Sequence, residues 1–238
     1  MKIGEDFEKI KWTLEKWQFL EPNAFIGDTF LCILAIFLAL KISRVSDGSA
    51  FYNNWIKFYI VMGISLFIGG LGHLLYQYWG AEGKYFSWYT AIIAIYFIEK
   101  ALLELHPSKN TKQYLTSLSI AKLILAITAL TVVIMSENLT VDSSKGLAIP
   151  SINSAVGMLF SLVYLGQLYQ NKGLGNFNYF LLGVIIILPS AFFQFLKINF
   201  AAWFDRNDIS HLLLAFGFIM FAAGIIKFSK HQNAPHQI

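Results

Sequence analysis

The chain has 238 residues, of which 56% are hydrophobic and only 13% are charged, and its formal net charge is +4. Soluble domains usually carry roughly 25% charged residues, and the mean hydropathy here is +0.57. The basic residues lie between apolar runs and form no stripe, so no nucleic acid partner is expected. Cys32 is the only cysteine, which excludes a disulfide framework and a thiolate zinc site. The composition therefore predicts an integral membrane protein.

Residues 1–21 precede the first apolar run and carry a pattern of their own. Five apolar side chains recur at intervals of four and three residues, at Ile3, Phe7, Ile10, Leu14 and Trp17. This spacing predicts an amphipathic helix over residues 3–20, which either lies in the membrane interface or packs on the end of the bundle. Pro22 would end this helix, because proline lacks the N–H that a helix interior needs.

Seven apolar runs follow, separated by short polar segments. A bilayer core offers no water to backbone groups, so a spanning segment must be a helix or a strand of a closed barrel. Barrel strands need roughly ten residues of alternating polarity, whereas these runs are about twice as long and do not alternate. They predict seven transmembrane helices, at about 24–42, 55–78, 86–105, 114–135, 149–169, 177–198 and 208–228.

The predicted fold class is an all-α integral membrane protein, a seven-transmembrane-helix bundle with an N-terminal amphipathic helix. Residues 1–21 would form the interfacial helix, residues 22–230 the transmembrane domain and residues 231–238 a polar tail. Pro189 is expected to kink the sixth helix. No internal repeat is evident, so an inverted-repeat transporter is not favoured.

Lysine and arginine residues in the short loops give the expected orientation. The loops on the side opposite the N-terminus hold more of them, although the N-terminal helix adds lysines to its own side. We expect a multi-pass protein of the plasma (inner) membrane, with its N-terminus outside and its C-terminus in the cytoplasm. The charged first residues predict no cleavable signal peptide. Membrane lipids are the expected partners, and a homo-oligomer stays open.

Ionisable residues inside a span are costly and therefore mark candidate functional sites. Asp28, His73 and His211 belong to spans one, two and seven, and each lies about one turn from the membrane side that holds the N-terminus of the chain. Asp208 lies just before His211. Two imidazoles and a carboxylate suit zinc and leave one position for water. Bound zinc would make that water a nucleophile near neutral pH. These residues predict a zinc site that hydrolyses a lipid amide or ester.

Each of these residues also has a purely structural explanation. Asp208 suits a helix N-cap, and Asp28 near the start of span one would interact favourably with the helix dipole. Helix ends and interfacial water would satisfy the histidines. The shared depth of ionisable residues from three spans is what favours a site.

Two stretches resemble a known superfamily. Span two contains Phe67-Ile68-Gly69-Gly70-Leu71-Gly72-His73, and span seven begins Asn207-Asp208-Ile209-Ser210-His211. They resemble the seven-helix superfamily of alkaline ceramidases, progestin and adipoQ receptors and hemolysin III proteins. Glu21-Pro22-Asn23, followed by Asp28, is similar to bacterial members of unknown function related to this group.

The resemblance implies zinc, lipid amide hydrolysis and two ligands that carry over, His73 and His211. The chain departs from the superfamily pattern in span two, where Gly69 replaces a serine, and in span seven, where Asn207 replaces the first histidine of a pair. Span three offers no aspartate. By our own reasoning, Asp28 or Asp208 would supply the remaining carboxylate ligand.

Three functions therefore compete. The first is the zinc-dependent lipid hydrolase. The second is a non-catalytic membrane protein that has lost the metal: a receptor, a scaffold or a conduit. The third is a b-type haem protein with His73 and His211 as axial ligands. A retinal protein is excluded because residues 212–226 contain no lysine, and signature motifs of G-protein-coupled receptors and of nucleotide-binding loops are missing.

Overall fold

A computed structural model describes residues 1–232, and seven of its helical segments are long and apolar enough to cross a membrane. Four segments are single helices: α1 (Pro22–Ser43), α2 (Ala50–Leu74), α5 (Lys109–Ser136) and α10 (Arg206–Gln232). The third joins α3 (Tyr76–Trp79), the 3-10 turn η1 (Gly80–Lys84) and α4 (Tyr85–Glu104). The seven predicted helices are thus confirmed as helices that are long and apolar enough to cross a membrane.

Two of the segments change geometry along their length. The fifth joins α6 (Ser144–Met158), a π-helical stretch η2 (Leu159–Leu165) and α7 (Gly166–Asn171). The sixth consists of α8 (Asn178–Ile187) and α9 (Pro189–Phe195). The break between α8 and α9 falls at Pro189, as predicted, because proline cannot continue the hydrogen-bond ladder of a helix.

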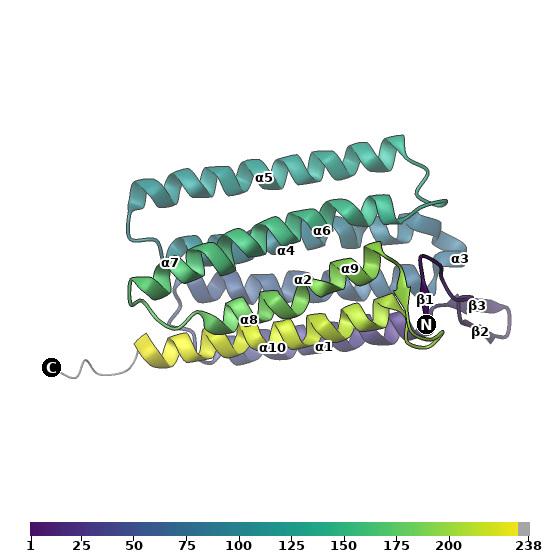
Figure 1. Ribbon diagram of the computed structural model, residues 1–238, viewed down its shortest axis with the longest axis horizontal. Coiled ribbons are helices and arrows are strands. Elements are labelled where there is room, and N and C mark those ends of the chain that lie inside the picture. Colours follow the sequence, from purple (N-terminus) through teal and green to yellow (C-terminus); the bar gives the residue numbers. More distant parts are fainter. Residues whose placement is uncertain (233–238) are drawn as a thin grey trace.

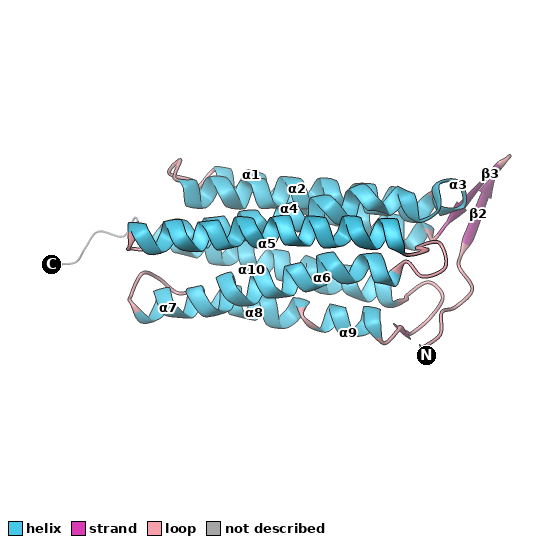
Figure 2. Cartoon of the chain, turned by 90° about the horizontal axis from the view of Figure 1, so that it is seen from above, coloured by secondary structure: helices cyan, strands magenta, loops and turns pink. Residues whose placement is uncertain are grey.

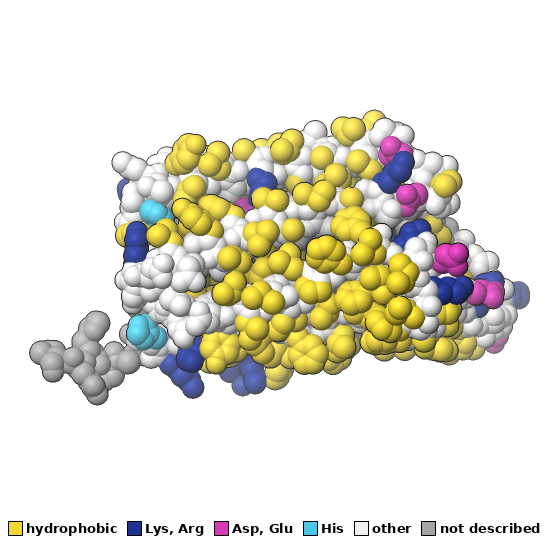
Figure 3. Space-filling model, viewed as in Figure 1, with side chains coloured by type: hydrophobic (Ala, Val, Ile, Leu, Met, Phe, Trp, Pro, Cys, Tyr) yellow, Lys and Arg dark blue, Asp and Glu magenta, His cyan; other side chains and the backbone are white. Residues whose placement is uncertain are grey.

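The helices run along one long axis, with the N-terminus at one end and the last turn of α10 at the other (Figure 1). We call these the N-terminal end and the C-terminal end of the bundle. Helix α1 packs on α2, α2 on α4, and α10 on α1, α8 and α9. Helix α5 lies at the edge, against α4 and α6 (Figures 1 and 2). Apolar side chains cover most of the middle of one face, and charged side chains gather at its ends (Figure 3).

The core near the C-terminal end is built of aromatic side chains. Trp55 of α2 is fully buried and stacks on Phe180 of α8, with 5.4 Å between ring centroids. The Tyr59 hydroxyl donates a hydrogen bond of 2.7 Å to the backbone oxygen of Phe218. Each aromatic pair contributes about 0.5–1.5 kcal/mol beyond its buried area, and close packing rather than water exclusion holds helices together in lipid. This half of the bundle is therefore densely packed, and we call it the solid half.

Polar contacts attach the edge helix α5. The Lys122 ammonium lies 2.6 Å from Glu99 Oε1 of α4 and donates a hydrogen bond of 2.6 Å to Asn153 Oδ1 of α6. Ser119 of α5 donates a hydrogen bond to the other Glu99 oxygen. Such groups at membrane depth must satisfy one another, because lipid offers no partner. The contacts explain how a sparsely buried helix keeps its place.

The predicted amphipathic helix of residues 1–21 is wrong. The segment forms β1 (Lys2–Ile3), which pairs with β4 (Ile198–Asn199), and a hairpin of β2 (Lys11–Leu14) and β3 (Trp17–Leu20). The apolar residues that fit a helical spacing also fit two antiparallel strands, in which Trp12 pairs with Phe19 and Leu14 pairs with Trp17. Cross-strand aromatic pairs of this kind stabilise a hairpin.

The ends of the predicted domain also differ in detail. Pro22 begins α1 rather than ending a preceding helix, and the first helical position is where proline's missing N–H is harmless. Helix α10 continues to Gln232, so the first residues of the predicted polar tail, 231–238, are helical. Residues 233–238 lie outside the described residues.

Candidate functional site

The four predicted zinc ligands are divided among three separate polar pairs at the N-terminal end of the bundle. His73, at the end of α2, has its Nδ1 2.8 Å from Glu21 Oε2. His211, in the second turn of α10, has its Nε2 3.1 Å from Asp28 Oδ1 of α1. Asp208 accepts a hydrogen bond of 2.8 Å from the Asn23 side chain. Each imidazole therefore has its own carboxylate partner.

Asp208 has a structural role that the sequence partly anticipated. Asp205 precedes α10 and accepts hydrogen bonds from the backbone N–H groups of Asn207, at 2.7 Å, and Asp208, at 3.3 Å. Asp208 in turn accepts one of 2.9 Å from the Asp205 N–H. This reciprocal arrangement is a capping box. Asp205, not Asp208, is the N-cap, and Asp208 completes the first turn.

These side chains as arranged do not fit a zinc ion. Within residues 1–232, no group of three or more histidine, cysteine, aspartate and glutamate side chains is placed to hold a metal. Zinc in proteins needs at least three such ligands converging at about 2.0–2.3 Å. The zinc assignment stays a prediction.

The close packing of His211 also bears on haem and on serine catalysis. Its Nδ1 is buried without a hydrogen-bond partner and lies 2.4 Å from the position that a Cβ on Gly27 would take. Helix α1 thus leaves no gap for a macrocycle on that side. Nor can this nitrogen reach a serine, as a catalytic triad requires. Glycine at position 27 is what permits the contact.

A second cluster surrounds Glu21, whose site role the sequence did not reveal. Glu21 is buried and adopts a left-handed backbone, with φ of +48°. Its Oε2 lies 2.9 Å from the Lys9 ammonium and 2.8 Å from His73. Burial alone would raise the pKa of Glu21, but His73, Lys84 and Lys9 outweigh it and hold the pKa well below its ordinary value. Glu21 is therefore a carboxylate throughout the neutral range.

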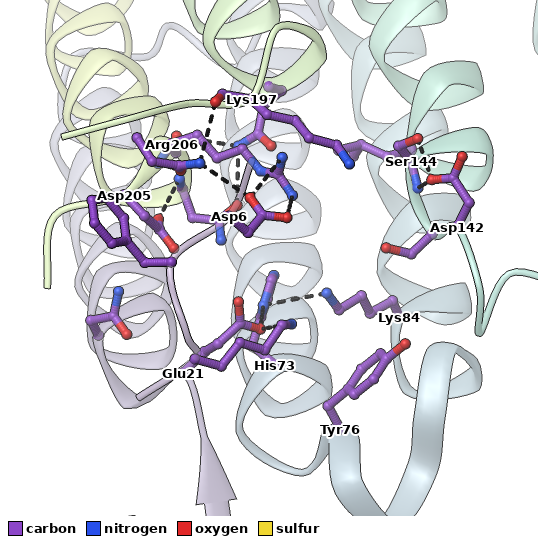
Figure 4. A pocket seen from close by; sticks show the side chains of 18 of the residues that line it. Asp6, Glu21, His73, Tyr76, Lys84, Asp142, Ser144, Lys197, Asp205 and Arg206 are labelled. Atoms are coloured by element: carbon purple, nitrogen blue, oxygen red, sulfur yellow. Dashed lines mark hydrogen bonds and ion pairs between the residues drawn. The ribbon is translucent and has the colours of Figure 1, made fainter. Parts of the chain in front are cut away.

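Lys84, at the end of η1, completes this cluster. It is only 9% exposed, and its ammonium lies 3.3 Å from His73 Nδ1. Figure 4 shows Glu21, His73 and Lys84 converging below the N-terminal segment. In the sequence, Lys84 is one lysine in a short loop and Glu21 one acid before a proline, so neither carries a pattern that marks a site. The packing of α2 against both α1 and η1 brings them together.

Two cavities meet at these residues. The outer one, which we call the vestibule, has about 400 Å³, and its charged lining comprises Asp6, Glu8, Lys9, Glu21, His73, Lys84, Asp142, Lys197, Asp205 and Arg206. The inner one, which we call the chamber, has about 270 Å³ and lies between α2, α4, α6, α9 and α10. Six residues line both: His73, Lys84, Trp88, Leu147, Gln194 and Asn207. The two cavities are therefore adjacent and share part of their walls.

The chamber is polar at its rim and apolar at its base. Asp28, His211 and Ser87 line the rim. The base is formed by aromatic and aliphatic side chains: Phe58, Met62, Ile95, Met158, Ile187, Phe218 and Phe221. Several of these belong to the solid aromatic core. The space therefore ends inside the bundle.

The N-terminal segment lies across the vestibule. The Asp6 carboxylate meets the Arg206 guanidinium through two contacts, of 3.1 and 3.2 Å. Asn199 donates a hydrogen bond of 2.8 Å to the Glu5 backbone oxygen, beside the β1–β4 pairing. Figure 4 shows Asp6 and Arg206 above the Glu21 cluster. Residues far apart in the chain thus form the outer wall of the cavity.

Fold and site together define a class: a seven-helix, membrane-type bundle with a two-part cavity open toward one end. Residues 24–230 match a protein family of unknown function, DUF6962, and the chain belongs to that family. No curated protein and no solved structure matches the chain. The function must therefore be argued from the site itself.

Proposed function

We propose that this protein is a multi-pass membrane protein that binds an amphipathic, lipid-like molecule. The polar head of the ligand would occupy the vestibule and its hydrocarbon chain the chamber. The observation that carries the proposal is the joining of a charged cavity to an apolar one through shared lining residues. Ligand sites are typically concave and mainly apolar, with a few convergent polar groups that fix orientation.

The base of the chamber argues for binding rather than conduction. A conduit would need a path to the C-terminal end of the bundle. Phe58, Phe218 and Phe221 close the chamber instead, and all three are at most 2% exposed. Beyond them, Trp55 and Phe180 stack tightly. A ligand would therefore enter and leave at the N-terminal half of the bundle.

Hydrolysis of a bound lipid amide or ester is the second candidate. It is favoured by the Glu21–His73 pair, in which Glu21 engages Nδ1 of an imidazole that lines both cavities, because an imidazole oriented by a carboxylate is a common general base. Product analysis on the same lipid probes separates the two candidates: released acyl chain indicates hydrolysis, and unchanged lipid indicates binding alone.

The orientation in the membrane remains the one proposed from the loop charges, with the N-terminus outside. The vestibule would then face the outside of the plasma (inner) membrane. A cysteine introduced at Gln18, in the exposed hairpin, should react with a membrane-impermeant maleimide in intact cells. A Cys32→Ser background removes the native thiol, and labelling only after lysis would reverse the assignment.

The binding proposal is tested by filling the chamber. Ala155 of α6 lines it, whereas its neighbour Val156 is 50% exposed on the outer face of the same helix. Binding of a single-chain lipid would be measured on protein in nanodiscs for Ala155→Phe and, as the matched control, Val156→Phe. We expect at least a tenfold loss of affinity in the first and none in the second. Equal affinities in both variants would refute the chamber as the chain site.

A further inference from the structure

Lys84 is a buried cation without an acidic partner of its own. Its side chain lines both the vestibule and the chamber, and its residue is only 9% exposed. Its ammonium has two close neighbours, neither of which carries a negative charge: His73 Nδ1 at 3.3 Å and the Tyr76 ring, whose centroid is 5.4 Å away. In the part of the chain that the structure describes, it forms no ion pair with a carboxylate. An ammonium buried in this way is costly unless it is paired.

The neighbouring acid is already engaged. Glu21 Oε2 lies within 3 Å of both Lys9 and His73. His73 Nδ1 cannot donate a proton to Glu21 and accept one from Lys84 at the same time. When His73 donates to Glu21, Lys84 therefore lacks even this acceptor.

Lys197, which is half-buried, is a second vestibule cation, and its charge interacts at longer range with Asp142. It also forms no ion pair with a carboxylate within residues 1–232, and it adopts a left-handed backbone with φ of +49°. Figure 4 shows its side chain extending toward the helix that carries Ser144. The other two vestibule cations are engaged, Lys9 with Glu21 and Arg206 with Asp6. Lys84 below and Lys197 above thus leave two ammonium groups facing one space.

We infer that the head group of the ligand is anionic, a carboxylate or a phosphate monoester, and that Lys84 binds it, with Lys197 at the rim. The inference rests on the proposed lipid-binding function and names its ligand class. Charge-assisted hydrogen bonds to a buried ammonium are the strong ones, and they form here where the chamber meets the vestibule. The vestibule also holds acids, Glu21, Asp142 and Asp205 among them, so the anion is expected beside the two lysines rather than elsewhere in the cavity.

The test compares three amphiphiles of equal chain length: hexadecanoate, hexadecyl phosphate and hexadecanol. Binding to the full chain in nanodiscs would be measured at low and at high salt, with each ligand corrected for partition into empty nanodiscs. We expect at least one anionic ligand to bind roughly tenfold or more tightly than the alcohol, since that is the usual worth of a hydrogen bond to a charged group. The preferred anion identifies carboxylate or phosphate.

Variants assign the effect to the lysines. Lys84→Met should lower the affinity for the preferred anion to that for hexadecanol, and Lys84→Arg should retain most of it. Lys197→Met, at the more accessible rim, should lose a smaller part and stays informative if Lys84→Met does not fold. Lys41→Met, at the C-terminal end of α1, should change nothing.

The possible outcomes distinguish failure of the anionic head group from failure of lipid binding itself. Equal binding of anions and alcohol in the wild type overturns the anionic head group and leaves lipid binding standing. Anion preference that survives in both Lys84→Met and Lys197→Met also overturns it. Binding of none of the three ligands overturns the proposed lipid-binding function.

Discussion

The two halves of this bundle are built in opposite ways. Toward the C-terminal end, Trp55, Tyr59 and Phe180 pack ring against ring without exposed surface. Toward the N-terminal end, which we call the hollow half, the bundle holds two adjacent cavities, the charged vestibule and the largely apolar chamber. Non-glycine residues with left-handed backbone, Glu21 and Lys197, line the hollow half. Stability is concentrated in one half, and buried charge and strained backbone, which mark functional sites, are concentrated in the other.

The largest expected effect is in the solid half. Trp55→Ala removes a fully buried side chain that contacts Phe58, Tyr59, Phe180 and Phe221. A cavity of this kind lowers the free energy of unfolding by about 3–5 kcal/mol. Unfolding in mixed detergent micelles measures it. The protein that remains folded should keep its lipid affinity. Loss of lipid affinity in the folded Trp55→Ala protein would contradict the separation of stability and binding between the two halves.

The next effect is in the hollow half, at the contact between α1 and α10. Gly27→Ala places a methyl group against the His211 ring, 2.4 Å from its Nδ1, and overpacking of this kind destabilises by about 1–3 kcal/mol. His211→Ala removes the obstacle, so the double variant should recover most of the loss caused by Gly27→Ala. A double-mutant cycle on the free energy of unfolding reports this coupling. Additive losses would mean that His211 does not occupy this position.

A smaller effect depends on pH and on Glu21. Because its pKa is held below the ordinary 4.5 in the folded protein, its contribution to stability is present above that pH and is lost as the pH falls further. Glu21→Gln lacks this contribution. The difference in free energy of unfolding between wild type and Glu21→Gln should therefore shrink below about pH 4.5.

Asp205 provides the internal contrast for this measurement. Its pKa is raised by burial and by the nearby carboxylates Asp208 and Glu21, against the hydrogen bonds from the backbone of α10. Titration of Asp205 changes the free energy of unfolding in the opposite direction. Because Asp205 is present in both wild type and Glu21→Gln, its contribution largely cancels in the difference between them. A difference that stays constant from pH 7 to pH 3 would show that Glu21 is not held as a carboxylate by its neighbours.

The smallest expected effect is at the outer wall of the vestibule. Asp6→Asn breaks the contact with Arg206, but the Asp6 side chain is 45% exposed, so stability should fall by at most about 1 kcal/mol. Glu137→Gln breaks a similarly exposed pair with Lys145 and is the matched control. Only Asp6→Asn should speed ligand release, because only Asp6 lies over the cavity. Equal release rates in both variants would show that the N-terminal segment does not control ligand release.

The seven spans were predictable because lipid demands helices and each run is long enough to cross. The N-terminal segment was not, because Leu14 and Trp17 fit a helical interval of three as well as a two-residue hairpin turn. That turn uses Glu15 with φ of +52°, a position where asparagine or glycine would have given a signal.

The candidate site was predictable in its location and not in its pairing. Asp28, His73 and His211 were placed correctly at one end of the bundle, because depth follows from position in a span. Their partners depend on how neighbouring helices rotate. The sequence could not show that Glu21 meets His73 or that the ring of His211 abuts Gly27.

A lipid site inside the N-terminal half of the bundle is tested most directly by photocrosslinking with a single-chain lipid that carries a diazirine at the end of its chain. In nanodiscs, we predict adducts at chamber residues such as Met158 and Ile95, which are lost in Ala155→Phe and retained in Val156→Phe. Adducts confined to lipid-facing residues such as Val156 and Ile152, and unchanged by Ala155→Phe, would contradict a lipid site inside the N-terminal half of the bundle.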